Sequence, residues 1–416
     1  MDLDEQIAAA IGALVDEQQL AGAVTLLWQD GNVVHAGAVG WRDRETDAPM
    51  TRDTIFRIAS MTKPITSTAA LMLYDEGRFS LDDPITDWAP ELARMRVLRS
   101  PDAALEDTVA AERPITFLDL LTHRAGFTYG AFHEGPIGDA CGAALGMDID
   151  SHLTPDAWIA ALATLPLIDQ PGRGFRYGVS TDLLGLLIAR IAGVSLETFL
   201  STRIFEPLGM KDTGFIVPAS QHHRRARMYG FDASGRLEHR PVHPRAAPAF
   251  LAERPAGLAY ASGGAGLWST VDDFLAFARM FVSDGAVDGV RLLKLETLKR
   301  MTANYLTDAQ IEEARIAGVP AFVGQGFGLG VAVVLDPERP DPTRGKGGVG
   351  TVAWPGAYGG WWQADPTDGS VMILLAQNAL DFDLVAQGYG LGVYMAIGEF
   401  FALASNRRET QRHKTL

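Results

Sequence analysis

Near the N-terminus, the spacing of hydrophobic residues changes from helical to strand-like and back. Residues 3–20 carry apolar side chains three or four positions apart, which predicts an amphipathic helix. Two apolar runs, 23–28 and 33–40, then flank an Asp-Gly turn at 30–31, which predicts a β-hairpin. The next apolar segment, 60–77, again has helical spacing, so we expect a helix soon after the hairpin.

The middle of the chain has helical spacing, and the last third returns to strand-like runs. Helices are predicted for four segments, 116–122, 155–165, 181–199 and 270–283. Residues 217–256 are rich in proline and arginine, which predicts an ordered, meandering loop region. The strands predicted for the last third are 327–335, 359–364 and 371–377. A helix of roughly 20 residues is expected to close the chain.

Strands at both ends with helices between them predict an α+β fold. The simplest arrangement is an antiparallel β-sheet built from both termini, flanked by N- and C-terminal helices, with a mainly helical domain inserted. We therefore expect a discontinuous α/β domain from residues 1–80 and 285–416. A mainly helical domain is expected from 81–284, with parts of 200–260 free to cross back onto the α/β domain. The length of 416 residues also favours two domains.

Composition narrows the class of protein but names no activity. A hydrophobic content of 47% is ordinary for a folded chain, and the net charge of −15 argues against nucleic acid as a partner. A single cysteine, Cys141, excludes an intrachain disulfide. The acidic start does not look like a secretory signal, and no apolar stretch reaches the ~18 residues of a membrane span. We therefore expect a cytoplasmic protein without a membrane span.

Candidate chemistry begins with Ser60-Met61-Thr62-Lys63, at the start of a predicted helix. Residues three apart on a helix share a face, so the Ser60 hydroxyl and the Lys63 amine are expected to point the same way. Lysine can take the serine proton only where burial or neighbouring charge favours its neutral form. The Ser60 backbone N–H, at a helix N-terminus, could help to hold an oxyanion. Alone, the four residues fit an ordinary helix start with a serine cap and a surface lysine equally well.

Two further stretches carry residues suited to acyl transfer. Tyr177 lies on a predicted turn before a helix, where its phenol could accept the Ser60 proton and return it to a leaving alcohol. Taken alone, a buried tyrosine bonded to backbone is the simpler interpretation. In the glycine-rich stretch 354–362, Ala357 could donate its N–H as a second oxyanion donor. Aromatic residues there could line an apolar pocket, although the adjacent tryptophans at its end are expected to pack in the sheet.

Together, and in this order, these stretches resemble the serine β-lactamase and penicillin-binding protein superfamily. The nearest branch is class C-like, and within it the family VIII carboxylesterases. Residues 60–63 (SMTK) match the Ser-x-x-Lys motif in full, and 177–179 (YGV) keep the tyrosine of Tyr-x-Asn but have valine for asparagine. Residues 354–356 (WPG) stand where lactamases have Lys-Thr-Gly, as the Trp-x-Gly of those esterases does. The resemblance extends over about residues 10–400.

This resemblance implies a β-lactamase/transpeptidase-like fold and a serine carboxylesterase that hydrolyses short-chain esters through an acyl-enzyme on Ser60. It also implies that Lys63 and Tyr177 share the acid–base work, with the first base left open. Tryptophan cannot bind a carboxylate as the lactamase lysine does, so an uncharged ester is expected to fit better than a carboxylate-bearing antibiotic. Weak β-lactam hydrolysis is expected as a side activity. A β-lactamase or D-amino-acid peptidase of the same fold is the alternative.

By family analogy, four residues are expected to bind substrate: Trp354, Gly356, Tyr129 and His123. Lys346, within a glycine-rich stretch, is an alternative third motif. We prefer Trp354, because strand-like residues follow it as they do in the family. The expected partner is therefore a small-molecule ester, and homo-oligomerisation stays open.

Other catalytic classes have little support. The chain contains no Gly-x-Ser-x-Gly elbow and no His-Glu-x-x-His motif. His239 and His243 are four residues apart, but Pro241 between them argues against one helical face. No metal and no other cofactor is therefore expected. A non-catalytic ligand-binding protein is the alternative from another class, and intact Ser60 and Lys63 argue against it.

Overall fold

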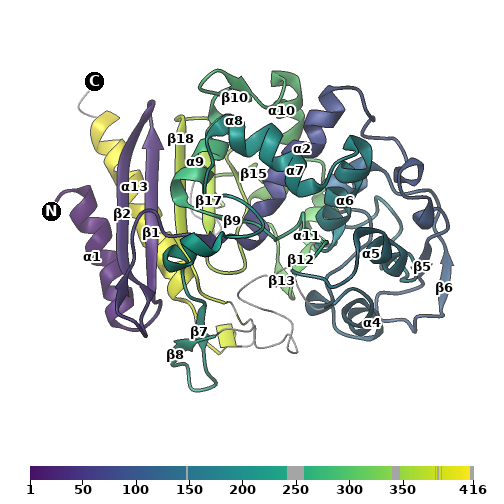
Figure 1. Cartoon of the computed structure of the whole chain (residues 1–416), viewed down its shortest axis with the longest axis horizontal. Coiled ribbons are helices and arrows are strands. Elements are labelled where there is room, and N and C mark those ends of the chain that lie inside the picture. Colours follow the sequence, from purple (N-terminus) through teal and green to yellow (C-terminus); the bar gives the residue numbers. More distant parts are fainter. Residues whose placement is uncertain are drawn as a thin grey trace.

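An antiparallel sheet built from both ends of the chain forms the centre of the fold (Figure 1). The computed structural model describes residues 1–146, 149–240, 257–339, 347–379, 381, 384–385 and 387–412, with side chains up to 405. The strands lie in the order β14-β15-β16-β17-β18-β1-β2-β3. Their bounds are β1 Gly22–Gln29, β2 Asn32–Asp43, β3 Ala48–Pro49, β14 Gln325–Phe327, β15 Ala332–Val334, β16 Val352–Ala353, β17 Trp361–Asp365 and β18 Ser370–Ala376. Because β1 pairs with β18, the two ends of the sequence meet at the middle of the sheet.

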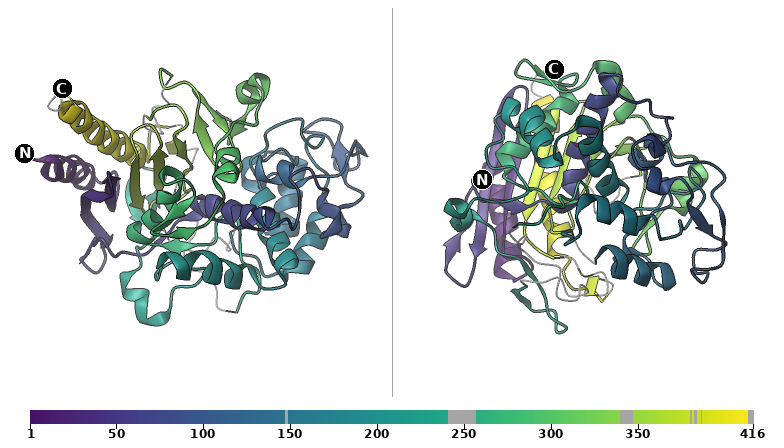
Figure 2. Two further views of the ribbon diagram at one scale, coloured as in Figure 1. Left: turned by 90° about the horizontal axis from the view of Figure 1, so that it is seen from above. Right: turned by 45° about the vertical axis from the view of Figure 1, so that its right-hand side comes forward.

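Two terminal helices lie side by side on one face of this sheet (Figures 1 and 2). They are α1 (Leu3–Asp16), which begins with a capping box formed by Asp2 and Glu5, and α13 (Gly392–Arg412). The opposite face packs against α2 (Thr62–Asp75) and α9 (Val271–Ala278). Alternate residues of each strand therefore enter different cores. Trp361 packs towards the terminal helices and its neighbour Trp362 packs against the phenylalanines of the α9 region, as expected for sheet residues.

The segment between the two parts of the sheet is mainly helical, and residues 96–192 of it lie to the right in Figure 1. Its helices are α3 Phe117–Leu121, α4 Pro136–Leu145, α5 Pro155–Leu162, α6 Ser180–Ala192, α7 Leu196–Leu200 and α8 Glu206–Leu208. Short strands pair as β4 Phe56–Arg57 with β9 Trp268–Ser269, β5 Arg96–Leu98 with β6 Thr108–Ala110, and β7 Tyr229–Phe231 with β8 Leu237–His239. The remaining elements are β10 Ala286–Val287, β11 Val290–Arg291, α10 Leu295–Met301, α11 Asp308–Glu313, β12 Arg315–Ile316 and β13 Val319–Pro320.

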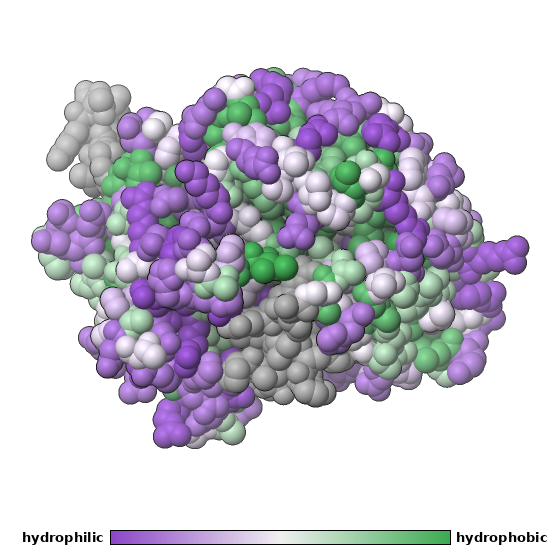
Figure 3. Space-filling model, viewed as in Figure 1, coloured by the Kyte–Doolittle hydropathy of each residue, from purple (hydrophilic) through white to green (hydrophobic). Residues whose placement is uncertain are grey.

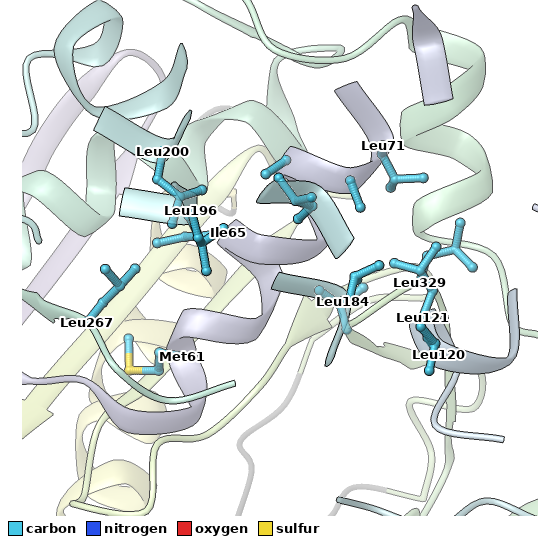
Figure 4. Packing of buried hydrophobic residues seen from close by; sticks show 14 of the residues in the cluster. Met61, Ile65, Leu71, Leu120, Leu121, Leu184, Leu196, Leu200, Leu267 and Leu329 are labelled. Atoms are coloured by element: carbon cyan, nitrogen blue, oxygen red, sulfur yellow. The ribbon is translucent and has the colours of Figure 1, made fainter. Parts of the chain in front are cut away.

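Helix α2 runs through the middle of the molecule and is buried for most of its length. Figure 4 shows side chains of α2 and the turn before it, such as Met61 and Ile65, packed among leucines from both parts of the chain. Leu184 and Leu196 come from the helical segment, whereas Leu329 comes from the sheet part. Truncating such a buried leucine to alanine costs about 2–5 kcal/mol, so this helix is held firmly between the two parts.

The predicted α+β fold, with an antiparallel sheet, flanking terminal helices and an inserted mainly helical region, is confirmed. Two predicted elements were wrong in detail. The helix predicted at 181–199 is two helices, because Gly193 adopts a left-handed conformation with φ 73° and ends α6. The strand predicted at 327–335 is the hairpin β14–β15, which turns at Gly330 with φ 92°.

The proposed division at residues 80 and 285 stays a prediction. Within 81–284, helix α9 packs against β1 and β18, and Tyr229 forms a β-bridge with Asn378 beside the sheet. The end of the loop region predicted at 217–256 lies outside the described residues. Within them, no helix by itself has the length and apolar character needed to cross a bilayer; α6 with the helix at 196–208 would pass only as a pair bent by 80°.

The visible surface in Figure 3 is mostly hydrophilic. Hydrophobic residues gather towards the middle of this face, next to the residues drawn in grey. A mostly hydrophilic surface is consistent with the net charge of −15. Most apolar side chains of the described residues are buried in the core.

Candidate active site

The candidate nucleophile lies on a strained turn that leads into α2. Ser60 is the middle residue of a 3₁₀ turn, Ala59–Met61, so it precedes the α-helix rather than beginning it as predicted. Ala59 has φ 45°, in the left-handed region that costs a non-glycine residue about 1 kcal/mol or more. The Ser60 side chain is partly exposed, whereas its two neighbours are buried. The turn therefore presents the hydroxyl outward from a rigid base.

Lys63 is completely buried, with 0% of its surface exposed. Its Nζ donates hydrogen bonds to Ser60 Oγ at 3.2 Å, Tyr129 Oη at 3.1 Å and the Gly264 carbonyl at 2.9 Å. The hydroxyl and the amine thus share one face, as the three-residue spacing predicts. A surface lysine after a serine cap, the alternative interpretation of this motif, is excluded by this burial.

Tyr177 lies beside this pair and is 7% exposed. Lys63 Nζ is 4.6 Å from the centre of the Tyr177 ring, and the Tyr177 hydroxyl accepts a hydrogen bond from Trp354 Nε1 at 3.2 Å. The indole N–H therefore helps to fix the position of the phenol oxygen. Within the described residues, no direct hydrogen bond joins the Tyr177 hydroxyl to Ser60 or Lys63. The structure therefore brings the three predicted catalytic residues together, and Tyr177 meets Lys63 through its ring rather than through its hydroxyl.

The glycine-rich stretch around Gly356 packs directly against the nucleophile turn. A Cβ on Gly356 would lie 2.5 Å from the Ile58 carbonyl oxygen, and one on Gly360 would lie 2.6 Å from Met61 Sδ. Only glycine allows the two turns to come so close. Ala357 follows as an exposed residue, and no described residue accepts a hydrogen bond from its N–H. Among the described residues this backbone donor therefore has no partner, and it lies on a turn that packs against Ile58 and Met61, which flank the nucleophile.

Trp354 was predicted to bind substrate, but its side chain is only 1% exposed. The indole ring packs against Tyr177 and Phe327, with ring centres 5.2 Å and 5.1 Å away. Its observed polar contact with the site is the N–H bond to the Tyr177 hydroxyl. We therefore interpret Trp354 as a donor to Tyr177 in the place where lactamases have a lysine; direct substrate contact stays a prediction.

Tyr129 is part of the lysine's hydrogen-bond system, which goes beyond the substrate-binding role predicted for it. Its hydroxyl accepts from Lys63 and donates to Asp182 Oδ2 at 2.9 Å. Burial, followed by the negative charge of Asp182, raises the pKa of Tyr129 well above its ordinary value. The phenol therefore keeps its proton, and that proton belongs to the bond with Asp182.

His123 was also predicted to bind substrate, but its side chain is 0% exposed, so direct substrate contact stays a prediction. Its ring packs on Tyr177 with centres 5.0 Å apart, and Nε2 shares a hydrogen bond of 3.3 Å with Thr181 Oγ1. Its carbonyl, on a residue with φ 52°, accepts from the Arg176 N–H immediately before Tyr177. Burial, then the charge of Lys63, lowers the pKa of His123 well below its ordinary value, so the ring is neutral. His123 supports Tyr177 from behind.

Sequence reasoning missed Asp182 and the Gly264 carbonyl. Asp182 is a buried acid on α6, five residues after Tyr177, in a helix whose other buried side chains are mostly apolar. A lone acid in such a helix is a signal that could have been used, since buried carboxylates require partners. The carbonyl of Gly264 carries no side-chain signal at all.

Other candidates do not add a site. Lys346 and His243 lie outside the described residues. The His239 ring, on β8, lies near the Tyr229 ring, and the two ring centres are 6.3 Å apart. Across the described part of the chain, no group of three or more His, Cys, Asp or Glu side chains could hold a metal ion.

Comparison with known proteins identifies similar chains. A family described as Beta-lactamase matches residues 7–390. An uncharacterised protein of Mycobacterium tuberculosis is 43% identical over 388 residues, 93% of this chain and 92% of the relative. Esterase EstB of Burkholderia gladioli is 32% identical over 395 residues, 90% of this chain and 91% of the esterase. The solved structure of EstCE1, described as a hydrolase with promiscuous acyltransferase activity, is 27% identical with a TM-score of 0.76, covering 95% of this chain and 98% of that chain.

Proposed function

The chain belongs to the β-lactamase family, and on that premise we propose that it is a serine carboxylesterase acting on short-chain, uncharged esters. Its relatives include an esterase and a hydrolase with acyltransferase activity, which supports a hydrolase or acyltransferase of the β-lactamase fold. The observation that carries the finer proposal is the contact between Trp354 Nε1 and the Tyr177 hydroxyl. An uncharged indole stands where a lactamase lysine would attract a substrate carboxylate.

The acylation step follows from the arrangement of the site. Ser60 Oγ attacks the ester carbonyl while its proton passes to Lys63, either directly or with Tyr177. The Ser60 and Ala357 N–H groups stabilise the oxyanion of the tetrahedral intermediate. When the intermediate collapses, the departing alkoxide takes up this proton. The acyl group remains bonded to Ser60. Tyr177 is suited to deliver this proton, because its ring lies against Lys63 Nζ and its oxygen is held by the Trp354 N–H.

Deacylation uses the same groups in reverse. A water molecule gives its proton to the basic pair and attacks the acyl carbon, and Ser60 Oγ leaves with the proton that the pair returns. An alcohol in place of water would give acyl transfer, a reaction named in the description of EstCE1. The ratio of acid to new ester, measured with a short alcohol present, separates hydrolase from acyltransferase behaviour.

The test compares p-nitrophenyl acetate and butyrate hydrolysis by the wild type, Ser60→Ala and Tyr177→Phe. We expect Ser60→Ala to lose at least about 10³-fold in kcat, because removing the nucleophile leaves only binding and the oxyanion donors. Ser67→Ala is the matched control. Ser67 lies on α2, is buried, and has no hydrogen-bond partner among the described residues, so its loss should leave activity unchanged.

Three outcomes would favour the alternatives. Faster turnover of a chromogenic cephalosporin than of any ester would favour a β-lactamase, and turnover of D-amino-acid amides would favour the peptidase. Failure of a fluorophosphonate to label Ser60 covalently in the wild type would favour a non-catalytic ligand-binding protein.

A further inference from the structure

The groups around the buried amine of Lys63 determine which neighbour can give it a proton. Its Nζ contacts three oxygens, those of Ser60, Tyr129 and Gly264. A neutral amine has two N–H donors and one lone pair. The carbonyl of Gly264 can only accept, so it takes one N–H. Whether the lone pair faces Ser60 or Tyr129 then depends on where the Tyr129 proton points.

Asp182 decides the direction of that proton. Its Oδ2 accepts from the Tyr129 hydroxyl at 2.9 Å, and a carboxylate oxygen cannot donate. Tyr129 must therefore present a lone pair to Lys63 and take the second N–H. The lone pair of the amine is left facing Ser60 Oγ, from which it can receive the hydroxyl proton.

The other oxygen of Asp182 holds the loop that carries Gly264. Oδ1 accepts from Tyr260 Oη at 3.1 Å, Ser262 Oγ at 2.5 Å and the Gly264 N–H at 3.1 Å. The same glycine thus gives its N–H to Asp182 and receives Lys63 on its carbonyl. A Cβ at Gly264 would lie 2.4 Å from Asp182 Oδ2 and 2.7 Å from Tyr129 Oη, so glycine is required for this close packing.

We propose that Asp182 is a positioning residue that directs proton transfer from Ser60 to Lys63. It acts through Tyr129 and Gly264 and does not contact the substrate. This role rests on the proposed esterase function, because it concerns the proton transfer that starts ester cleavage. In the step concerned, the Ser60 O–H bond breaks, an N–H bond forms on Lys63, and Oγ bonds to the electrophile. The resulting ammonium gives its three N–H groups to the same three oxygens.

The decisive variant is Asp182→Asn, which keeps size and burial. Three donors face Oδ1, so the amide oxygen of the variant stays there and its NH₂ group faces Tyr129. Tyr129 then accepts from the amide and turns its own proton towards Lys63, which engages the lone pair that Ser60 needs. We expect kcat to fall about 100-fold, within the usual contribution of a general base, with KM little changed.

The double variant separates positioning from a structural role. In Tyr129→Phe there is no hydroxyl proton to misdirect, so adding Asp182→Asn should cost at most a few-fold more. A merely structural Asp182 would give multiplicative losses in the double variant and a raised KM. Ser262→Ala is the control: it removes one donor from Oδ1 and leaves the Tyr129 bond in place, so kcat should stay within a few-fold of the wild type.

The readout is the rate at which a fluorophosphonate labels Ser60, measured beside ester hydrolysis. Labelling requires the same activated hydroxyl but no natural substrate, so it tests Asp182 even if the ester proposal fails. A wild type that is labelled but hydrolyses no ester overturns the esterase proposal alone. An unlabelled wild type, a wild-type labelling rate in Asp182→Asn, or multiplicative losses overturn the positioning role. Should Asp182→Asn fail to fold, Tyr129→Phe decides: an unchanged labelling rate overturns the proposal.

Discussion

Two clusters in this protein, one around Thr25 and one around Ser60, each place a hydroxyl next to a basic group. They differ in what surrounds the hydroxyl. On the face of the sheet that carries α1 and α13, Thr25 on β1, His35 on β2 and Asp4 on α1 form a hydroxyl–imidazole–carboxylate row (Figure 1). Thr25 Oγ1 is 2.8 Å from His35 Nε2, and His35 Nδ1 is 2.5 Å from Asp4 Oδ1. These bonds are shorter than the 3.2 Å between Lys63 and Ser60.

Short hydrogen bonds alone do not make an active site. Thr25 and His35 are 2% and 3% exposed, and Thr25 lies in the middle of a strand whose neighbours are paired on both sides. No substrate can approach such a hydroxyl. Ser60 is partly exposed, and the turn that packs against its neighbours Ile58 and Met61 carries the Ala357 N–H that we propose as an oxyanion donor. We therefore expect variants near Ser60 to change rates and variants near Thr25 to change stability.

The largest effect in this comparison should come from Gly356→Ala. The new Cβ would meet the Ile58 carbonyl at 2.5 Å, so the turn must move and the Ala357 N–H moves with it. We expect kcat to fall about 100-fold, the usual loss for one oxyanion donor. Steady-state kinetics on p-nitrophenyl butyrate measures this.

A matched glycine variant controls for that substitution. Gly398 lies on α13, and a Cβ there meets nothing within 4 Å. Gly398→Ala should keep full activity and gain up to about 1 kcal/mol of stability from helix propensity. If Gly356→Ala keeps the wild-type kcat, the proposed oxyanion role of this turn is contradicted.

A smaller loss of rate is expected for Trp354→Phe. The substitution keeps an aromatic ring beside Tyr177 and removes only the indole N–H that its hydroxyl accepts. A typical hydrogen bond contributes about 0.5–1.5 kcal/mol, so kcat should fall by a few-fold to about tenfold. If kcat is unchanged while KM rises, Trp354 contacts substrate instead, as the sequence predicted.

On the sealed cluster, Thr25→Val should leave kcat and KM as they are. It removes the hydroxyl from a buried imidazole without changing the size of the side chain, which leaves Nε2 without its partner. The free energy of unfolding should fall by about 1–3 kcal/mol, as measured by urea denaturation. A loss of activity at unchanged stability would contradict the distinction between the two clusters.

The last effect concerns a buried acid apart from both clusters, and it depends on pH. Burial raises the pKa of Asp273 to about 6, although Thr213 and the Asp212 N–H donate to it. An unfolded aspartate titrates near 3.9, so the folded state holds a proton that the unfolded state releases between these values. The stabilising contribution of the protonated form is present below about pH 4 and is lost as the pH rises through about 6.

The matching variant is Asp273→Asn, which cannot ionise. Its stability relative to the wild type should increase between pH 4 and pH 7, by on the order of 2 kcal/mol, while kcat stays the same. Urea denaturation at both pH values measures the difference. An equal difference at both would mean that Asp273 titrates alike in the folded and unfolded states.

Local spacing in the sequence already determined much of the site and the fold. The three-position spacing from Ser60 to Lys63 brings a hydroxyl and an amine to one side of the chain, and the Asp-Gly turn at 30–31 predicted the hairpin β1–β2. These features follow from bond geometry and periodicity over a few residues, so a sequence displays them directly.

Tertiary structure decided which distant groups serve that amine. Tyr129 and Gly264 are 66 and 201 residues from Lys63, and Asp182 reaches both through a helix whose burial no local pattern specified. Packing likewise placed His123 behind Tyr177 and left Ser60 reachable while it sealed Thr25. The direction in which a proton moves depends on all the donors and acceptors around it, and these meet only when the chain has folded.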